Sequence, residues 1–189
     1  MKKELIRCPW CLSSELMKTY HDEEWGVPVH DDALHFEYIV LDSFQAGLSW
    51  STILNKRENF RKAFDSFNAE KISRYTEKKI EKLINDTGII RNRLKIIATI
   101  TNAKSFIKIQ KEFGSFDKYI WQFTKGKIIT NKLKSHKQIQ ASTSISEEMS
   151  KDLYLRGFKF VGPTICYAYM QAAGIVNDHL VECHRYKKV

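Results

Sequence analysis

Hydrophobic residues recur along most of the chain at intervals of three and four, the spacing that places them on one face of an α-helix. Between residues 31 and 45, Leu34, Tyr38 and Leu41 share a face, and two aspartates stand at the start, where the helix dipole favours them. The same spacing predicts helices over residues 31–45, 49–64, 76–84, 91–113, 118–123, 146–156 and 163–173. No segment alternates convincingly as a strand does, so the chain is predicted to be all-α.

Small and polar residues mark where these helices begin and end. Gly88 and Gly114 follow helical segments, where a glycine commonly ends a helix. Ser146 is suited to cap residues 146–156, and Pro163 fits a first helical turn, where its missing N–H has no partner to lose. Residues 125–137 carry only short apolar patches and support no assignment.

A glycine-bounded connector, residues 157–162 (GFKFVG), joins the last two predicted helices. Gly157 and Gly162 allow the backbone to approach a phosphate, the N–H groups that open the next helix form an anion site, and Lys159 adds charge. Such a contact holds a nucleic acid strand without reading its sequence. The alternative is a plain helix turn whose Phe158 and Phe160 pack into the core.

The composition favours one packed unit with a polyanionic partner. Of the 189 residues 43% are hydrophobic, and no linker or repeat divides the chain, so residues 1–189 are expected to form a single helical unit of two lobes sharing one core. The net charge of +9 favours DNA, RNA or an anionic membrane surface as partner. No apolar run approaches the ~20 residues of a membrane span, and the first residues lack the apolar core of a secretory signal, so a cytoplasmic protein is expected.

Cysteines and histidines near the two ends of the chain form a candidate metal site. The candidate ligands are Cys8, His21, His179 and Cys183. His179 and Cys183 are four residues apart, so a helical turn would present both side chains on one side. Two cysteines and two histidines make a closed tetrahedral zinc site, which is structural because no position is left for water. Cys11 and His184 leave a site of three cysteines and one histidine open, and Cys166 is expected simply to pack.

Six segments together resemble one known family, the bacterial type I 3-methyladenine DNA glycosylases of the helix-hairpin-helix superfamily. They are residues 7–10 (RCPW), 20–28 (YHDEEWGVP), 45–50 (QAGLSW), 88–93 (GIIRNR), 156–162 (RGFKFVG) and 176–179 (VNDH). The resemblance spans almost the whole chain and implies a monomeric, all-helical enzyme whose hairpin grips double-stranded DNA. It also implies a structural zinc ion (Zn2+) held by Cys8, His21, His179 and Cys183, with Cys11 and His184 outside the site.

The resemblance further implies removal of 3-methyladenine, with the nucleotide extruded and the base held in an aromatic pocket. Methylation at N3 makes adenine cationic and already a good leaving group, so a strong general acid is not required. Trp50 is the expected stacking platform, Tyr20 is expected to contact the base edge, and Trp10 and Trp25 occupy further aromatic positions typical of the family. Core packing is the alternative role of each ring.

Asp42 is the main departure from the family pattern, which usually has a glutamate here to hydrogen-bond the alkylated base. Aspartate keeps the negative charge but is one methylene shorter, so it must sit closer or act through water. Ser43 replaces a more usual glycine, and the alternative is that both residues merely interrupt a helix. Gly47 and Leu48, in the loop that follows, are expected to fill the space of the extruded nucleotide.

Two further positions bear on the reaction class. Lyase-type relatives carry a lysine two residues after the last glycine of the hairpin, whereas this chain has Thr164, so no Schiff base is expected. The water-activating aspartate of other relatives aligns with Asn177, although Asp178 adjoins it. A monofunctional hydrolase is therefore the favoured interpretation over a non-enzymatic damage sensor or a zinc-stabilised scaffold for protein partners. The scaffold would bind its partners with little dependence on salt.

Basic residues are spread along the longest predicted helix. They are Arg91, Arg93, Lys95, Lys104 and Lys108. Most are expected to form a solvated face. Arg91 and Arg93, which lie in one of the family segments, are the better candidates for phosphate contacts.

Overall fold

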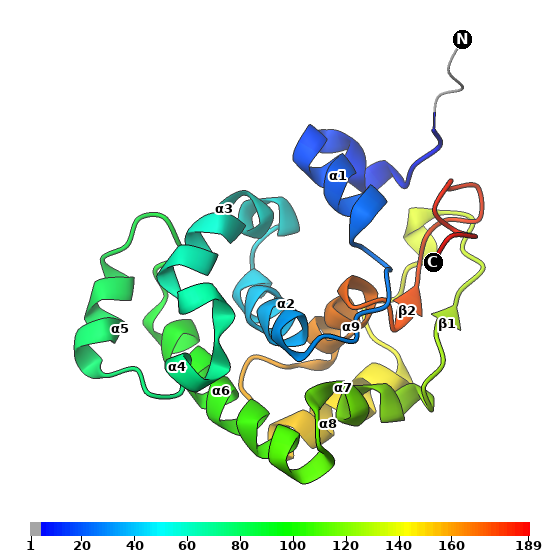
Figure 1. Ribbon diagram of the computed structural model, residues 1–189. Helices are drawn as coiled ribbons and strands as arrows, with labels where there is room; N and C mark the ends of the chain where they lie inside the picture. Colours follow the sequence, from blue (N-terminus) through cyan, green and yellow to red (C-terminus); the bar gives the residue numbers. More distant parts are fainter. Residues whose placement is uncertain (1–4) are drawn as a thin grey trace.

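A computed structural model describes residues 5–189 and shows an almost entirely helical protein (Figure 1). The α-helices are α1 (Glu15–Glu23), α2 (Asp32–Gln45), α3 (Trp50–Ala63), α4 (Ala69–Ile72), α5 (Glu77–Ile84), α6 (Arg93–Phe113), α7 (Phe116–Trp121), α8 (Ser144–Leu155) and α9 (Pro163–Ala172). Short 3₁₀ helices lie at Pro9–Ser13, Asp65–Phe67, Gln122–Thr124 and His136–Gln138. Strands β1 (Ile129–Thr130) and β2 (Val176–Asn177) pair in parallel. The all-α prediction is confirmed, and no helix in residues 5–189 has the length and apolar character of a membrane span.

The predicted helices are present, and their ends shift where a capping residue differs from the expected one. α6 begins at Arg93 because the Asn92 side chain accepts a hydrogen bond from the backbone N–H of Lys95 at 3.1 Å. The prediction that Ser146 caps α8 is wrong. Thr143 is the cap, and Ser146 completes a capping box with it from inside the first turn.

Helix α2 is the centre of the fold and packs against α3, α6, α7 and α9 (Figure 1). Residues 35–44 are all buried, as befits a helix surrounded by others rather than lying on a surface. Asp42 is therefore held inside the protein by the burial of its whole helix.

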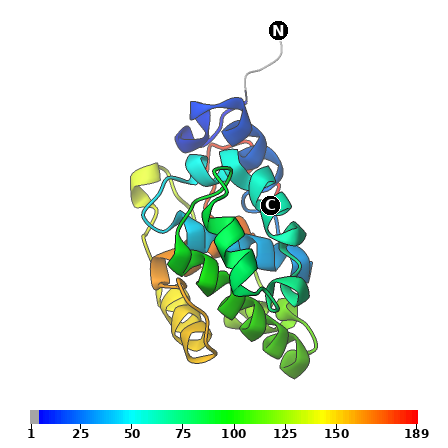
Figure 2. The same ribbon diagram turned by 90° about the vertical axis from the view of Figure 1, so that its left-hand side faces the viewer.

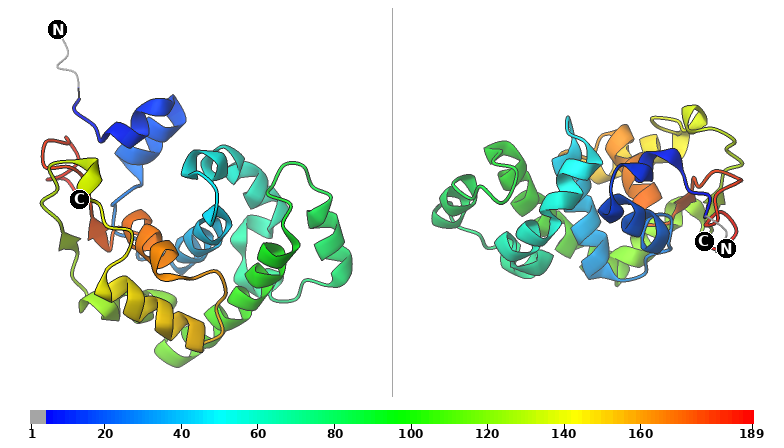
Figure 3. Two further views of the ribbon diagram at one scale, coloured as in Figure 1. Left: turned by 180° about the vertical axis from the view of Figure 1, so that it is seen from behind. Right: turned by 90° about the horizontal axis from the view of Figure 1, so that it is seen from above.

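Two apolar clusters divide the interior. The larger one surrounds α2, and the smaller one joins the two ends of the chain through Cys8, Cys11, Met17, Tyr20, Trp25, Leu54 and Cys183. The backbone N–H of His184 donates to the carbonyl of Ile6 at 2.9 Å, so the C-terminal segment lies beside the N-terminal one (Figure 3). Trp50 packs against both clusters and marks the boundary between them.

The segment between α1 and α2 crosses closely over the end of α9. The backbone N–H of Gly26 donates to the carbonyl of Gln171, and that of Val29 to the carbonyl of Ala173, both at 3.0 Å. A Cβ at Gly174 would lie 2.3 Å from the carbonyl carbon of Val27, so only glycine fits there. This crossing fixes Trp25 relative to α9.

Candidate active site

A cavity of about 390 Å³ lies between the two apolar clusters, within the size range of ligand sites. It is lined by Trp10, Ser13, Met17, Tyr20, Trp25, Asp42, Gln45, Ser49, Trp50, Ser51, His136, Ile139, Ala168, Gln171 and Ala172. The structure thus brings together the five residues that were predicted to form the pocket, from both sides of the boundary between the two apolar clusters. They are Trp10, Tyr20, Trp25, Asp42 and Trp50.

The walls of this cavity are aromatic. The ring centroids of Tyr20 and Trp50 are 5.2 Å apart at 45°, and those of Trp10 and Trp25 are 5.0 Å apart at 72°. The indole Nε1 of Trp50 is buried and has no hydrogen-bond partner in the described chain. A flat heterocycle in this cavity can therefore stack on a ring and also meet a free donor.

Asp42 supplies the one carboxyl group that residues 5–189 contribute to the cavity lining. The residue is 2% exposed, and its Oδ2 has no hydrogen-bond partner among residues 5–189. Burial raises the pKa of Asp42 well above its ordinary value, and the positive charge of Arg57 offsets this only in part. A buried carboxyl without a donor is costly, and a cationic ligand would relieve that cost.

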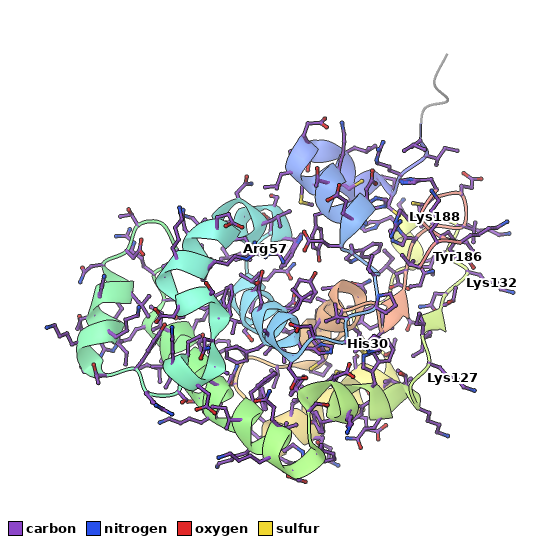
Figure 4. The ribbon with its side chains drawn as sticks, in the orientation of Figure 1. His30, Arg57, Lys127, Lys132, Tyr186 and Lys188 are labelled. Carbon is purple, nitrogen blue, oxygen red and sulfur yellow. The ribbon has the colours of Figure 1, made fainter. Side chains whose placement is uncertain are left out.

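Arg57, on α3 (Figure 4), compensates the charge of Asp42 only in part because other carboxylates already bind it. Its Nε donates to Glu37 at 2.5 Å, and its Nη1 donates to Glu24 at 2.6 Å. Tyr38 donates to the same Glu24 carboxylate at 3.1 Å. These bonds tie the segment that follows α1 to α2 and α3, behind the cavity wall.

The loop between α2 and α3 stands at the rim of the cavity. Gly47 has a φ of +79°, which favours glycine, and no atom lies within 4 Å of where its Cβ would be. Leu48 follows it and is 40% exposed. Ser49 then caps α3 and lines the cavity.

The predicted hairpin connects α8 and α9. Gly157 has a φ of +97°, and Gly162 caps α9 with open space around its Cβ position, so the start of α9 is accessible to a ligand. Lys159 is exposed; of the two phenylalanines, Phe158 is fully buried and Phe160 is 38% exposed. Figure 2 shows the hairpin and the α2–α3 loop on the same side of the molecule.

The metal-ligand prediction is confirmed in its geometry. The ligand atoms of Cys8, His21, His179 and Cys183 all lie within 4.8 Å of one another and are buried, so the group can hold a metal ion. Cys11 and His184, the alternative ligands, are not part of this group of ligand atoms. The Cys11 thiol donates to the carbonyl of Cys8 at 3.1 Å, and His184 pairs with the carbonyl of Ile6 at 3.0 Å.

One detail of the metal prediction is wrong. His179 and Cys183 lie after β2 in a segment of turns rather than on a helix, and the Cys183 N–H bonds to the carbonyl of Leu180 at 2.8 Å. A tight turn brings residues four apart together as a helical turn does. The spacing could therefore not distinguish the two.

Neighbouring groups orient both histidine rings. The Nδ1 of His21 lies 2.7 Å from Asp22, which Arg7 holds from the other side at 2.7 Å, and the Nε2 of His179 donates to the carbonyl of Trp25 at 3.0 Å. The remaining ring nitrogens face the cysteine sulfur atoms. The interaction between the two thiols lowers the pKa of Cys183 and raises that of Cys8, so Cys183 is the one of the pair that ionises first.

Comparison with known proteins agrees with this site. The sequence model of the methyladenine glycosylase family matches residues 10–186. The chain belongs to this family. It is 45% identical to DNA-3-methyladenine glycosylase 1 of Escherichia coli (strain K12), over 94% of this chain and 95% of that protein. A homologue from Haemophilus influenzae, named DNA-3-methyladenine glycosylase, is 42% identical over 94% of this chain and 96% of that protein.

Solved structures of the family have the same fold. A crystal structure of 3-methyladenine DNA glycosylase I superposes with a TM-score of 0.92 at 45% identity, covering 95% of this chain and 98% of that one. The enzyme from Staphylococcus aureus superposes with a TM-score of 0.91 at 33% identity, covering 94% of this chain and 95% of that one. Another, a variant in complex with 3-methyladenine, gives 0.91 at 32% identity and covers 94% and 96%.

In this member of the methyladenine glycosylase family, Asn177 and Asp178 are both engaged by the protein. Asn177 donates to the carbonyl of Tyr186 at 2.9 Å, and Asp178 accepts from Asn131, Tyr167 and Gln171, each at 2.7 Å. Neither residue lines the cavity. Both belong to the framework that holds the C-terminal segment.

The basic residues of α6 differ from expectation in two respects. Lys95 is 6% exposed, so its assignment to a solvated face is wrong, whereas Lys104 and Lys108 are exposed as expected. Arg93 pairs with Glu81 at 2.5 Å and with Glu77, both on α5, while Arg91 is exposed. The α5 carboxylates neutralise much of the charge that made Arg93 a candidate phosphate ligand.

Several residues of the cavity lining were not predicted from the sequence, among them His136, Ile139 and Gln171. His136 and Ile139 come from the connector between β1 and α8, most of which supported no helix assignment, and Gln171 comes from the end of α9. Nothing local marks them, because the connector reaches the cavity only through the β1–β2 pairing and the contact of Leu133 with Val181.

Proposed function

We propose that this chain is a monofunctional DNA glycosylase that hydrolyses the N-glycosidic bond of 3-methyladenine in double-stranded DNA. One observation carries the proposal: a buried carboxyl without a donor, Asp42, shares an aromatic cavity with the unpaired indole N–H of Trp50. The family supports it, since its named members are 3-methyladenine glycosylases and one solved member holds 3-methyladenine.

Recognition of the base rests on its charge. The N3-methylated adenine is cationic in DNA, so its approach lowers the pKa of Asp42 and draws the carboxyl into its ionised form. The resulting pair involves a carboxyl that is only 2% exposed, so the attraction is stronger than between two groups at the surface. Trp50 stacks on the cationic ring, Tyr20 contacts its edge, and Trp10 and Trp25 complete the wall. An unmodified adenine is uncharged, so it would leave the buried carboxyl of Asp42 without a cationic partner.

Bond cleavage then needs little from the protein. The bond between C1′ and the base nitrogen breaks, and its electron pair neutralises the cationic base as it leaves. A water oxygen bonds to C1′ and releases a proton, which completes the hydrolysis. No lysine stands at residue 164 to form a Schiff base, so the DNA backbone stays intact. Asp42 acts on charge: it favours binding of the cationic base, and its carboxylate favours the positive charge that develops on the sugar as the bond breaks.

The loop and the hairpin hold the DNA in this proposal. Gly157, Lys159 and Gly162 bind the phosphates of one strand at the start of α9, while Gly47 and Leu48 fill the gap left by the extruded nucleotide. Extrusion costs a few kcal/mol, and stacking on aromatic rings returns about 1–3 kcal/mol per base. The damaged base alone gains the added attraction of Asp42.

The metal group fits a structural zinc ion. Two thiolates and two imidazoles with oriented rings match the donor set of closed zinc sites, and such a set leaves no position for substrate. Bound zinc would crosslink the two ends of the chain. Since the Trp25 ring lies 4.7 Å from that of His179, the crosslink would also steady the cavity wall. We expect the enzyme to act as a monomer in the cytoplasm.

Chromatography of the bases released from methylated duplex DNA tests the function. Free 3-methyladenine should accumulate with enzyme and time, and the DNA strands should break only after later treatment with base or heat. Binding of methylated DNA without release of any base would make the protein a damage sensor. Strand breaks formed without added base would contradict a monofunctional hydrolase.

A further inference from the structure

Helix α6 carries a stripe of polar residues that are buried although none of them lines the cavity. They are Lys95, Thr99, Asn102 and Ser105, and each is at most 6% exposed. Their spacing of three and four residues places them on one face of the helix. That face meets the α2–α3 loop at one end and the α8–α9 hairpin at the other (Figure 3).

Lys95 holds the beginning of the loop. Its Nζ donates to the carbonyl of Phe44 at 2.8 Å and to that of Ala46 at 2.6 Å, which belong to the last turn of α2 and its cap. Burial lowers the pKa of this lysine, and no carboxylate in residues 5–189 pairs with it. The negative end of the α2 dipole thus takes the place of a counter-ion, directly before Gly47.

Asn102 holds the hairpin from the same helix. Its side chain accepts from the backbone N–H of Lys159 at 2.8 Å and donates to the carbonyl of that residue at 3.0 Å. The hairpin also meets Lys95, whose Nζ lies 5.9 Å from the ring centroid of Phe160. A hydrogen bond of 3.3 Å from Ser43 to the carbonyl of Phe160 also joins α2 directly to the hairpin.

We propose that Lys95 is a positioning residue for base extrusion. Together with Asn102 it sets the distance between the loop that carries Leu48 and the hairpin that holds the strand, because both are fastened to one rigid helix. This inference rests on the proposed function, and in particular on the entry of Leu48 into the duplex. Its consequence is specific: Lys95 matters where a base must leave a double helix and does not matter where the base is already unpaired.

The variant Lys95→Met tests this, because methionine keeps the length of the side chain and leaves no buried charge. Lys104→Met is the matched control, since Lys104 is an exposed lysine on the same helix. We expect kcat/KM for methylated duplex DNA to fall about tenfold or more in Lys95→Met, as for loss of a hydrogen bond to a charged group. Excision from methylated single-stranded DNA and calorimetric binding of free 3-methyladenine should stay within about twofold of wild type.

A purely structural role would lower excision from single and double strands equally, and that result overturns the inference. Equal activity of Lys95→Met and wild type on duplex DNA overturns it as well. Lys95→Arg, which retains charged donors, should recover part of the duplex activity. Should Lys95→Met not fold, Lys95→Gln keeps an uncharged NH2 donor group and should show the same selective loss to a smaller degree.

A double-mutant cycle distinguishes a failure of this inference from a failure of the proposed function on which it rests. If Lys95 acts through the loop, Lys95→Met should cost less duplex activity in a Leu48→Ala background than in wild type. Full additivity would show that Lys95 does not act through Leu48. Absence of methylated-base release by wild-type protein on either substrate would instead refute the glycosylase function itself.

Discussion

Asp42 and Trp50 line one cavity, and each has a buried polar atom, Oδ2 and Nε1, without a hydrogen-bond partner among the described residues. Buried polar groups are nearly always paired, so two unpaired polar atoms on residues of one cavity indicate a local cost to folding stability. One is an acceptor and the other a donor. Together with the aromatic rings of the lining, they favour a ligand that is flat, polar at its edge and positively charged.

Replacing the carboxyl of Asp42 by an amide tests the charge argument. Asp42→Asn should lower kcat/KM for 3-methyladenine release about 10- to 150-fold, which corresponds to the ~1.5–3 kcal/mol of a hydrogen bond to a charged group. Steady-state release of the base from methylated duplex DNA measures the change. The exposed residue Glu23, on α1, provides a control in Glu23→Gln, which should act like wild type. Unchanged release by Asp42→Asn would show that the carboxyl of Asp42 has no role in base release.

The same substitution should stabilise the fold. Since the folded-state pKa of Asp42 is raised, its favourable contribution is complete below the ordinary aspartate pKa of ~3.9 and is lost as pH rises toward the folded-state value. An amide at this position does not ionise and carries no such loss. Asp42→Asn should therefore melt at a higher temperature than wild type near neutral pH, and the gap should close below about pH 4. A constant gap across thermal melts at a series of pH values would show that burial of charge is not its cause.

Trp50 should contribute to base binding by stacking on the base. Trp50→Ala is expected to weaken binding of free 3-methyladenine about 5- to 150-fold, the equivalent of ~1–3 kcal/mol per stacked base. Calorimetry is the suitable measurement, because removing a tryptophan alters the intrinsic fluorescence. Trp121 is buried in the larger cluster away from the cavity, so a loss of affinity in Trp121→Phe equal to that in Trp50→Ala would point to general loosening instead.

Cysteine variants distinguish the metal ligands from their neighbours. Cys183→Ser should lose bound zinc, as measured by elemental analysis, and should melt at a lower temperature than wild type, because structural zinc contributes folding energy. Cys11→Ser is the matched control, since this buried thiol lies three residues from Cys8 and outside the ligand group. We expect it to keep its zinc. Loss of zinc from Cys11→Ser with retention in Cys183→Ser would reverse the assignment.

The hairpin lysine should act on affinity without affecting base choice. Lys159→Gln is expected to weaken binding to methylated and unmethylated duplexes alike and to reduce the slope of log affinity against log salt by about 1, as for one lost phosphate contact. Fluorescence anisotropy at several salt concentrations gives this slope. An unchanged slope would place Lys159 outside the contact with DNA.

Local signals account for most of the fold. The 3.6-residue periodicity located α2, α3, α5, α6 and α9, since each buries an apolar face. α1 was not predicted, because only Met17, Tyr20 and His21 of its nine residues are buried. β1 and β2 are two residues each, too short for any alternation to appear.

Of the site residues, only those in or beside recognisable sequence motifs were predictable. Asp42 and the aromatic residues stand in or beside segments that resemble a known family, and the structure gathers them in one cavity. Lys95 was assigned to the surface because a lysine on a helix ordinarily points to water. Its burial depends on the end of α2, 49 residues earlier in the chain, which no local pattern reports.

The ligand group that joins Cys8 to Cys183 also sets an order of events during synthesis. A ribosome releases every residue of the cavity lining, from Trp10 to Ala172, before the segment with His179 and Cys183. The nascent chain therefore carries all the pocket side chains before the ligand group is complete. Fragments cut short before Cys183 would retain the hairpin yet lack the clasp behind the aromatic wall, and we expect them to lose selectivity for damaged DNA.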